Sequence, residues 1–215
     1  MTSVIFWGAT GQARVLREAL ADRARLVALF DNRAIASPFD DVQIHLGETG
    51  FFRWQATQEQ DAMPSACVAI GGPHGRDRLE RMKWLADHGH PPLGVTHPTA
   101  FIARDTKIGN GCQILALSAV CANTHLGNAI IINTKASVDH DCVIGDGVHI
   151  GPGATLAGEV TVDEFAFIGT GATILPGLRI GTDAVIGAGA VVTRNVAAGE
   201  TVIGCPARPF FRTKI

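Results

Sequence analysis

The sequence predicts two domains, a small α/β domain followed by a parallel β structure that coils with a period of six residues. Three observations support this fold class. The N-terminal part has the pattern strand, glycine turn, helix and strand. Every sixth residue from Ile102 to Val192 is aliphatic, and glycine directly follows seven of these residues. We therefore assign residues 1–97 to an α/β domain with a small, Rossmann-like parallel sheet, and residues 98–215 to the coiled β domain and its tail.

The composition of the 215-residue chain excludes several classes of protein. Its 18 basic and 20 acidic residues are scattered and give a net charge of −2, so nothing favours binding to nucleic acid or to an anionic membrane. The apolar runs are too short to cross a bilayer, and the N-terminus lacks the features of a signal peptide. Five cysteines occur without a CxxC pair, which predicts reduced packing residues and no metal site. We expect a soluble, cytoplasmic protein.

The chain begins with a βαβ unit. Residues 4–7 predict a buried strand, residues 14–24 a helix with one apolar face, and residues 26–30 a second strand that ends at Asp31 and Asn32. The glycine turn between them directs backbone N–H groups and a helix N-terminus beyond the strand ends, which suits a phosphate. The turn lacks the full GxGxxG fingerprint, so a tight turn without a ligand explains it equally well. A helix cap or a solvated turn explains Asp31 nearly as well.

The rest of the first domain is less regular. Residues 33–63 predict no clear element. Residues 66–70 predict a third strand, residues 75–87 an amphipathic helix, and residues 93–95 a last short strand.

The ends of the three main strands carry the candidate ligand site of this domain. Gly8, Asp31 and Gly71 each follow or end a predicted strand. Parallel strands place such ends along one edge of a sheet, where open α/β sheets bind ligands. We therefore expect these residues to line one crevice.

The second domain is defined by its aliphatic frame. Sixteen positions carry it: Ile102, Ile108, Ile114, Val120, Leu126, Ile132, Val138, Ile144, Ile150, Leu156, Val162, Ile168, Ile174, Ile180, Ile186 and Val192. A period of six fits neither a helix nor one long strand, but it fits a short strand and a turn, repeated. We expect the aliphatic side chains to stack as a dry core. The glycine that follows them, with further Gly, Asn or Asp nearby, should supply residues tolerant of positive φ at each corner.

This repeat resembles that of the hexapeptide-repeat acyltransferases. Their chains wind into a left-handed parallel β-helix with three hexads per coil, which here implies about five coils. Left-handed crossovers are rare among parallel strands, so the handedness follows from the resemblance alone. The tail from Gly204 to Arg208 is also similar to the ending of many of these enzymes.

Histidines interrupt the otherwise apolar and small-residue frame. An aliphatic β-helix needs none, yet the repeat contains His125, His140 and His149. With three hexads per coil, His140 stacks between Ala122 of the coil before and Gly158 of the coil after. An imidazole that projects outward over two such small neighbours predicts a groove.

The neighbours of this imidazole in the sequence are both carboxylates. Asp139 and Asp141 flank His140. A carboxylate bonded to one ring nitrogen fixes the tautomer and raises the basicity of the other nitrogen, as a general base requires. A surface histidine in a charged turn is the alternative, and the small stacked neighbours favour the base.

The stretch over residues 133–154 contains an Asn-Thr motif followed by Asp-His-Asp-Cys. It is similar to the bacterial nucleotide-sugar acetyltransferases that acetylate 4-amino-4,6-dideoxyhexoses, and to the related sialic-acid O-acetyltransferases. The resemblance covers essentially the whole chain. It implies acetyl-CoA as co-substrate, a nucleotide sugar as acceptor, a role in building a surface polysaccharide or other glycan, and a homotrimer with sites at the subunit interfaces.

The resemblance also implies roles for individual positions. The catalytic pair is His140 as base and Asp141 as the acid that raises its basicity. The substrate-binding residues are Thr10, Gly11, Gln12, Asp31, Asn32, Gly71 and Asn133. The cofactor-binding residues are His149, Thr170 and Ala188. To these we add the backbone N–H of Gly158, one coil above the base, as a candidate donor to the oxyanion.

Two departures from the family leave the nucleotide open. Gln12-Ala13 stands where the family often has Gly-His, and Asp31-Asn32 stands where it has Asp-Asp. Both changes fall where the family recognises the nucleobase and the ribose. The acceptor is therefore expected to be GDP-perosamine or a UDP-linked 4-amino sugar.

We expect direct transfer, in which His140 takes a proton from the sugar amine as it attacks the thioester. Three alternatives remain at this stage. The acceptor could be a sugar hydroxyl, as in sialic-acid O-acetylation. A zinc hydratase like the γ-class carbonic anhydrases would need three converging histidines, and we expect His125 and His140 on one face with His149 on the next. The β-helix could also be a non-catalytic trimerisation stalk.

Overall fold

The structure is a computed structural model that describes residues 2–58 and 63–210. The α/β domain holds a parallel four-stranded sheet in the order β3-β2-β1-β4. Its elements are β1 (Thr2–Trp7), α1 (Gly11–Leu20), η1 (Ala21–Arg23), β2 (Ala24–Asp31), β3 (Ile44–Leu46), α2 (Gly47–Gln55), β4 (Ser65–Val68) and α3 (Gly75–Asp87). Helix α1 packs on one face of the sheet, and α2 and α3 pack on the other.

The apolar pattern explains these elements. The last four residues of β1 are all buried, as is typical of a parallel strand covered on both faces. Helix α1 buries Ala13, Leu16 and Leu20, which share one face. It ends four residues earlier than predicted, because Ala21 at its C-cap adopts a φ of 44°, which an α-helix cannot continue.

Two elements lie in the stretch where the sequence predicted none. Strand β3 has three residues at the edge of the sheet and none of them is buried, so it lacks an apolar signature. Helix α2 buries only Phe51 and Trp54. The predicted bounds of α3, by contrast, are confirmed at both ends.

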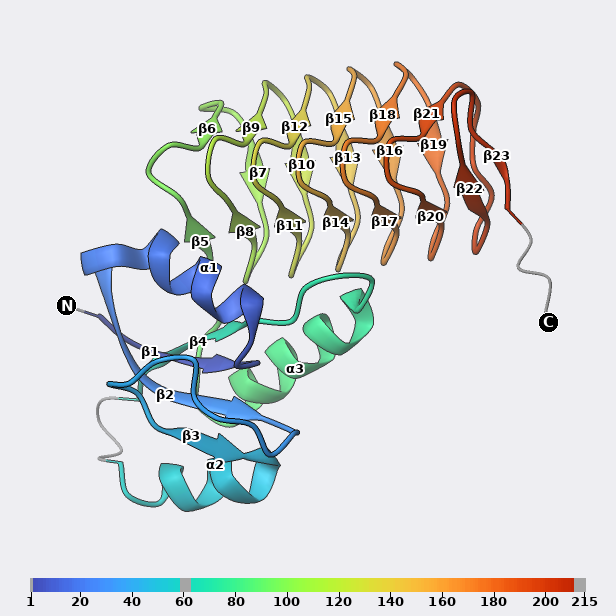
Figure 1. Cartoon of the computed structure of the whole chain (residues 1–215). Helices are drawn as coiled ribbons and strands as arrows, with labels where there is room; N and C mark the ends of the chain where they lie inside the picture. Colours follow the sequence, from blue (N-terminus) through green and yellow to red (C-terminus); the bar gives the residue numbers. More distant parts are fainter. Residues whose placement is uncertain (1, 59–62, 211–215) are drawn as a thin grey trace, which may run out of the picture.

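The second domain is a β-helix with three flat faces (Figure 1). Face 1 contains β5 (Val95–Thr96), β8 (Gln113–Ile114), β11 (Ile131–Ile132), β14 (His149–Ile150), β17 (Phe167–Ile168), β20 (Val185–Ile186), β22 (Thr201–Ile203) and β23 (Arg208–Pro209). Face 2 contains β6 (Phe101–Ile102), β9 (Ala119–Val120), β12 (Ser137–Val138), β15 (Thr155–Leu156), β18 (Thr173–Ile174) and β21 (Val191–Val192). Face 3 contains β7 (Lys107–Ile108), β10 (His125–Leu126), β13 (Val143–Ile144), β16 (Thr161–Val162) and β19 (Arg179–Ile180).

The coil has the predicted length. From β5 to β18, each strand pairs in parallel with the strand eighteen residues further on, as His125 does with Val143. The aliphatic frame forms the core, and its members from Ile114 onward are buried. Ile108 is 41% exposed and Ile102 is half-buried, because the first coil has a neighbouring coil on only one side.

The corners have the predicted positive φ, carried at many of them by a nearby Gly, Asn or Asp, but not by the glycines that directly follow the aliphatic residues. Positive φ occurs every six residues from Gly111 to Gly189, two positions after those glycines, and eight of these fourteen corner residues are not glycine. The glycines after the aliphatic residues are needed for close stacking instead. A Cβ at Gly145, for example, would lie 2.6 Å from the backbone nitrogen of Glu164 on the next coil.

Face 1 packs against the α/β domain (Figure 1). Arg78 of α3 is fully buried, and its guanidinium donates to the carbonyl groups of Ile70, Ala129 and Gly147. The short strand predicted at residues 93–95 is shared by the two domains. The Leu93 N–H donates to the carbonyl of Ala66 in β4, whereas Val95 already pairs with β8 of the β-helix. In the described part of the chain, no helix is long and apolar enough to cross a membrane.

Candidate active site

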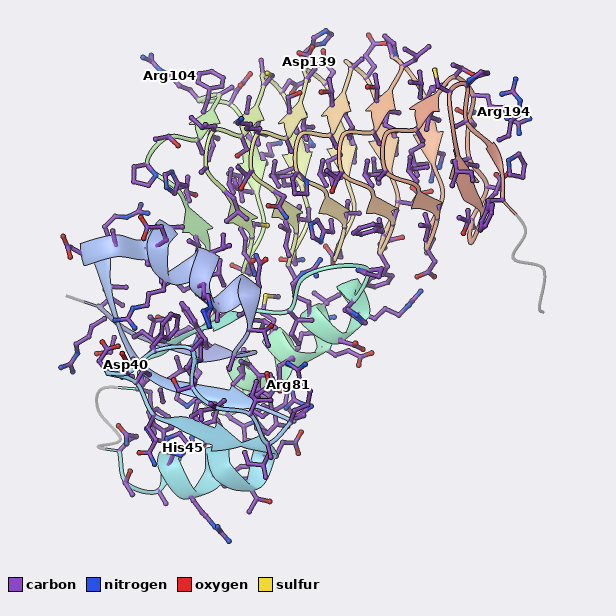
Figure 2. The ribbon with its side chains drawn as sticks, viewed as in Figure 1. Asp40, His45, Arg81, Arg104, Asp139 and Arg194 are labelled. Carbon is purple, nitrogen blue, oxygen red and sulfur yellow. The ribbon has the colours of Figure 1, made fainter. Side chains whose placement is uncertain are left out.

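The predicted site residues fall on two opposite sides of the β-helix. His140, Asp141 and Gly158 lie at the corner between faces 2 and 3, in the turns after β12 and β15. In a three-sided prism this corner is opposite face 1, against which the α/β domain packs. Figure 2 shows Asp139 at the edge of the β-helix that points away from the α/β domain. The other predicted residues belong to the α/β domain or border face 1.

Hydrogen bonds fix the imidazole at the outer corner. His140 Nδ1 lies 2.7 Å from Asp141 Oδ2, and the His140 backbone N–H donates to Asp139 Oδ1 over 2.8 Å. Asn123, one coil earlier, donates its amide to Asp141 Oδ1 over 2.6 Å. Asp141 adopts a φ of 58°, which aspartate tolerates well. The hydrogen bonds from Asn123 to Asp141 and from His140 to Asp141 therefore fix the imidazole ring, and Nε2 takes no part in them.

The same contacts tune the acidity of the ring. The hydrogen bond that His140 Nδ1–H donates to Asp141 raises the pKa of His140 above its usual 6.5, and the negative charges of Asp139 and Glu159 add to this effect. The hydrogen bond from Asn123, followed by that from His140, lowers the pKa of Asp141, which keeps it ionised. The arrangement can hold and release a proton at Nε2. Sequence reasoning missed Asn123, although its position eighteen residues before Asp141 marks it.

Gly158 lies directly over this imidazole, as the stacking of coils predicted. A Cβ built on Gly158 would lie 2.5 Å from both Cε1 and Nε2 of His140, so a larger residue would collide with the ring. Gly158 itself is buried, and among the described residues its N–H finds no acceptor. A free amide therefore lies close to the basic nitrogen.

The three histidines of the repeat do not converge. His125 lies on face 3 and His149 on face 1, while His140 lies in a corner turn, so the expectation that His125 and His140 share a face was wrong. The six-residue period assigns each histidine to a hexad, but it does not show whether the residue lies before or after the corner of the β-helix. The described residues also contain no group of three side chains suited to a metal ion.

The second candidate region is a hollow at the strand ends of the α/β domain, with a volume of about 400 Å³. As predicted, Gly8, Asp31 and Gly71 come together there, joined by Thr10 and Asn32. The N-terminus of α1 begins beside it at Gly11. Gly8 must be glycine, because its φ is 103° and a Cβ would overlap the Ala69 carbonyl. Backbone N–H groups and a helix N-terminus of this kind suit an anion.

Asp31 lines this hollow, and its carboxylate already accepts hydrogen bonds from other residues of the domain. It accepts hydrogen bonds from the backbone N–H of Ala9 and from the guanidinium of Arg33. Burial alone would raise its pKa, but the bonds from Arg33 and Ala9 outweigh burial and lower it. Sequence reasoning missed Arg33, which is exposed and borders the hollow.

Gln12 lies next to Gly71 of the hollow, since a Cβ built on Gly71 would be 3.3 Å from Gln12 Oε1. Its amide donates to Gln113 Oε1 of β8 over 2.6 Å, and Gln113 in turn donates to the Val68 carbonyl over 2.7 Å. Gln12 therefore joins the α/β domain to face 1.

His149 and Asn133 connect the hollow to the β-helix. His149 Nδ1 lies 3.2 Å from the Gly72 carbonyl, and its Nε2 lies 3.1 Å from the Asn133 amide nitrogen. Burial, with the nearby Arg78 cation, lowers the pKa of His149 to about 4, so the ring is neutral at physiological pH. A neutral ring can donate to Gly72 and accept from Asn133.

Thr170 and Ala188 are exposed in the turns after β17 and β20, in the same corner as Asn133. This corner, between faces 1 and 2, forms a continuous edge that runs along the coils away from the α/β domain. An extended ligand could follow it.

Comparisons with known proteins match both domains. The family described as bacterial transferase hexapeptide (six repeats) matches residues 123–158 and 159–194. PerB from Caulobacter crescentus, solved in complex with CoA and GDP-perosamine, is 32% identical with a TM-score of 0.88, over 98% of each chain. A comparison with curated proteins gave no match.

Two further solved structures are similar over nearly the whole chain. The acetyltransferase domain of PglB from Neisseria gonorrhoeae, in complex with acetyl coenzyme A, is 28% identical with a TM-score of 0.84, covering 97% of this chain and 98% of that one. WeeI from Acinetobacter baumannii is 28% identical with a TM-score of 0.83, covering 98% and 100%. These likenesses confirm the left-handed parallel β-helix.

Proposed function

Because the chain belongs to the hexapeptide-repeat nucleotide-sugar N-acetyltransferases, we propose that it transfers the acetyl group of acetyl-CoA to the 4-amino group of a nucleotide-linked 4-amino-4,6-dideoxyhexose. The acceptor is GDP-perosamine or a UDP-linked 4-amino sugar. The observation that carries the proposal is the His140–Asp141 pair over Gly158 in a chain that matches PerB from end to end.

His140 acts as the general base in this proposal. Its Nε2 removes a proton from the sugar amine while the amine nitrogen attacks the thioester carbon, and Asp141 stabilises the imidazolium that forms. The tetrahedral intermediate then collapses, the carbon–sulfur bond breaks, and CoA leaves as the thiolate, which takes up a proton. The raised pKa of His140 supports this role, since it strengthens the base.

The oxyanion of that intermediate needs a donor close to the base. The free N–H of Gly158, on the coil after His140, supports its assignment to this role. A preorganised backbone donor costs no rearrangement during the reaction.

The nucleotide sugar binds in the hollow of the α/β domain. Its diphosphate lies at Thr10 and Gly11, where α1 begins, and its sugar points toward Gly71 and Asn133. Acetyl-CoA lies along the corner of Thr170 and Ala188, next to His149. Acetyl-CoA and nucleotide sugars are cytoplasmic metabolites, which agrees with a role in glycan precursor synthesis.

The opposite locations of the hollow and His140 support a homotrimer with shared sites. A sugar held in the hollow of one subunit lies on the face 1 side, while His140 of that subunit lies at the far corner. The far corner of a neighbouring subunit must therefore complete the site. Val143 and Leu175 on that side are 48% and 40% exposed, as suits a contact between subunits.

The test is acetyl transfer from acetyl-CoA to a panel of GDP- and UDP-linked 4-amino sugars, with the corresponding 4-hydroxy sugars as controls. We expect turnover with an amino sugar, and a loss of about 100- to 10,000-fold in kcat in His140→Ala. Affinity for acetyl-CoA, measured by calorimetry, should persist in this variant, and His125→Ala should keep full activity. Unchanged kcat in His140→Ala would exclude its role as base, and acetylation of only the hydroxy sugars would exclude the amine acceptor.

A further inference from the structure

A second hollow continues the nucleotide site along α3. Its volume is about 370 Å³, and it shares Trp7, Asn32, Ile70 and Asp77 with the first. A ligand that fills the first hollow can therefore extend into the second. Figure 2 shows Arg81, which lines the second hollow, on the side of α3 away from the β-helix.

The orientation of the bound nucleotide sugar decides which part of the ligand lies in this second hollow. On the proposed function, the sugar faces Gly71 at the β-helix and the diphosphate lies at the N-terminus of α1. The nucleobase is at the other end of the ligand. It must therefore point away from the β-helix, toward Arg81 and Asp77.

Arg81 is held as a rigid donor. Its guanidinium carbon lies 4.0 Å from the ring centroid of Trp7 and 4.7 Å from that of Trp84, and its Nη1 bonds to Glu48 over 2.9 Å. The side chain is 18% exposed. A guanidinium fork of this kind can donate two parallel hydrogen bonds, which matches O6 and N7 of guanine.

Asp77 provides the complementary acceptor. It stands four residues before Arg81 in α3, so the two side chains lie next to each other on one face of the helix. Asp77 is 66% exposed, and its Oδ2 lies 3.4 Å from His74 Nδ1. A carboxylate accepts hydrogen bonds only, so it suits the adjacent N1–H and N2–H₂ donors of guanine.

We propose that the second hollow binds guanine, with Arg81 bonded to O6 and N7 and Asp77 bonded to N1 and N2. Uracil offers a single N–H between two carbonyl oxygens, which a carboxylate would repel. Adenine offers an acceptor at N1, which a carboxylate would also repel. The pair therefore selects a GDP-linked acceptor over a UDP-linked one, and this conclusion rests on the proposed function.

The test compares GDP and UDP, and the two matching 4-amino sugars, with the full-length protein. We expect the wild type to bind GDP more tightly than UDP in calorimetry and to favour the GDP sugar in kcat/KM. Asp77→Asn and Arg81→Lys should each weaken GDP binding by about 5- to 150-fold, the range for losing one good base contact. UDP binding should change little. Asp87→Asn, an exposed carboxylate at the end of the same helix, is the matched control and should leave both affinities unchanged.

The two proposals fail in different ways. Equal or tighter binding of UDP by the wild type, or less than a twofold change for GDP in both variants, would overturn the guanine site even if acetyl transfer proceeds. Selective binding of GDP that both variants lose, without acetyl transfer to any amino sugar, would support the guanine site and overturn the proposed function instead.

Discussion

Replacing Gly158 with alanine tests the geometry of the base with a single methyl group. The added Cβ would lie 2.5 Å from Cε1 and Nε2 of His140 and 3.1 Å from Nδ1. Since carbon atoms pack at about 3.5 Å or more, the ring must move by about 1 Å. That movement disturbs the 2.7 Å bond to Asp141 and carries Nε2 away from the acceptor amine. A displacement of this size can cost about 100-fold in rate, and we expect that loss in kcat.

The fold should tolerate the same change. Gly158 does not have positive φ, so alanine suits its backbone, and the His140 side chain is 54% exposed and can swing toward solvent. Alanine also restricts the unfolded chain, which stabilises a protein by about 0.4–1 kcal/mol at a compatible site. The melting temperature should therefore stay equal or rise slightly while activity falls.

The assay measures kcat with saturating amino sugar and acetyl-CoA, together with thermal unfolding and acetyl-CoA affinity. Gly94→Ala is the matched control, because its added methyl would lie at an ordinary 3.4 Å from the nearest atom, the Cys112 carbonyl oxygen. A kcat within threefold of wild type in Gly158→Ala would refute the placement of the proton acceptor. A large drop in melting temperature would refute the claim that the ring can move aside.

Two further predictions concern ionisation and stability. His140 must be neutral to accept a proton, so kcat should fall as the pH drops through its raised pKa. Asp141→Asn removes the largest cause of the raised pKa, so it should shift the acid limb of the kcat–pH profile to lower pH and reduce the plateau. An acid limb that does not move would show that another group sets it. Arg78→Met should lower the free energy of unfolding by about 2–4 kcal/mol, because it leaves buried carbonyl groups at the domain junction without donors; denaturant unfolding measures this, and an unchanged midpoint would mean that the junction adapts.

The regular part of the fold could be predicted because its sequence and geometry share one period. The aliphatic frame defined the strands from β6 to β21, and counting eighteen residues from His140 led to Gly158. The same count reaches Asn123 from Asp141, so that contact was within reach of the sequence. The contact of Gln12 with Gln113 was not, because these residues meet through tertiary packing that no local pattern records. Arg33 lies only two residues after Asp31, so its pairing was a local contact that sequence reasoning overlooked.

The separation of the site into two sides was also beyond the sequence. Hexad counting gives the order of the faces but not the face that the α/β domain covers. That choice follows from Arg78, whose guanidinium bonds to carbonyl groups of irregular backbone, and from Gln113, a polar residue at an outward position of the repeat.

The eighteen-residue coil also limits how the chain can change its length. Inserting one complete coil between Gly158 and Thr170 would keep every later residue at its own corner and only change its height along the helix axis. Removing one hexad would instead move Thr170 and Ala188 one corner back, away from the edge that also holds Asn133. Evolution and protein engineering can therefore lengthen or shorten this domain without scrambling its ligand edge only in steps of a full coil.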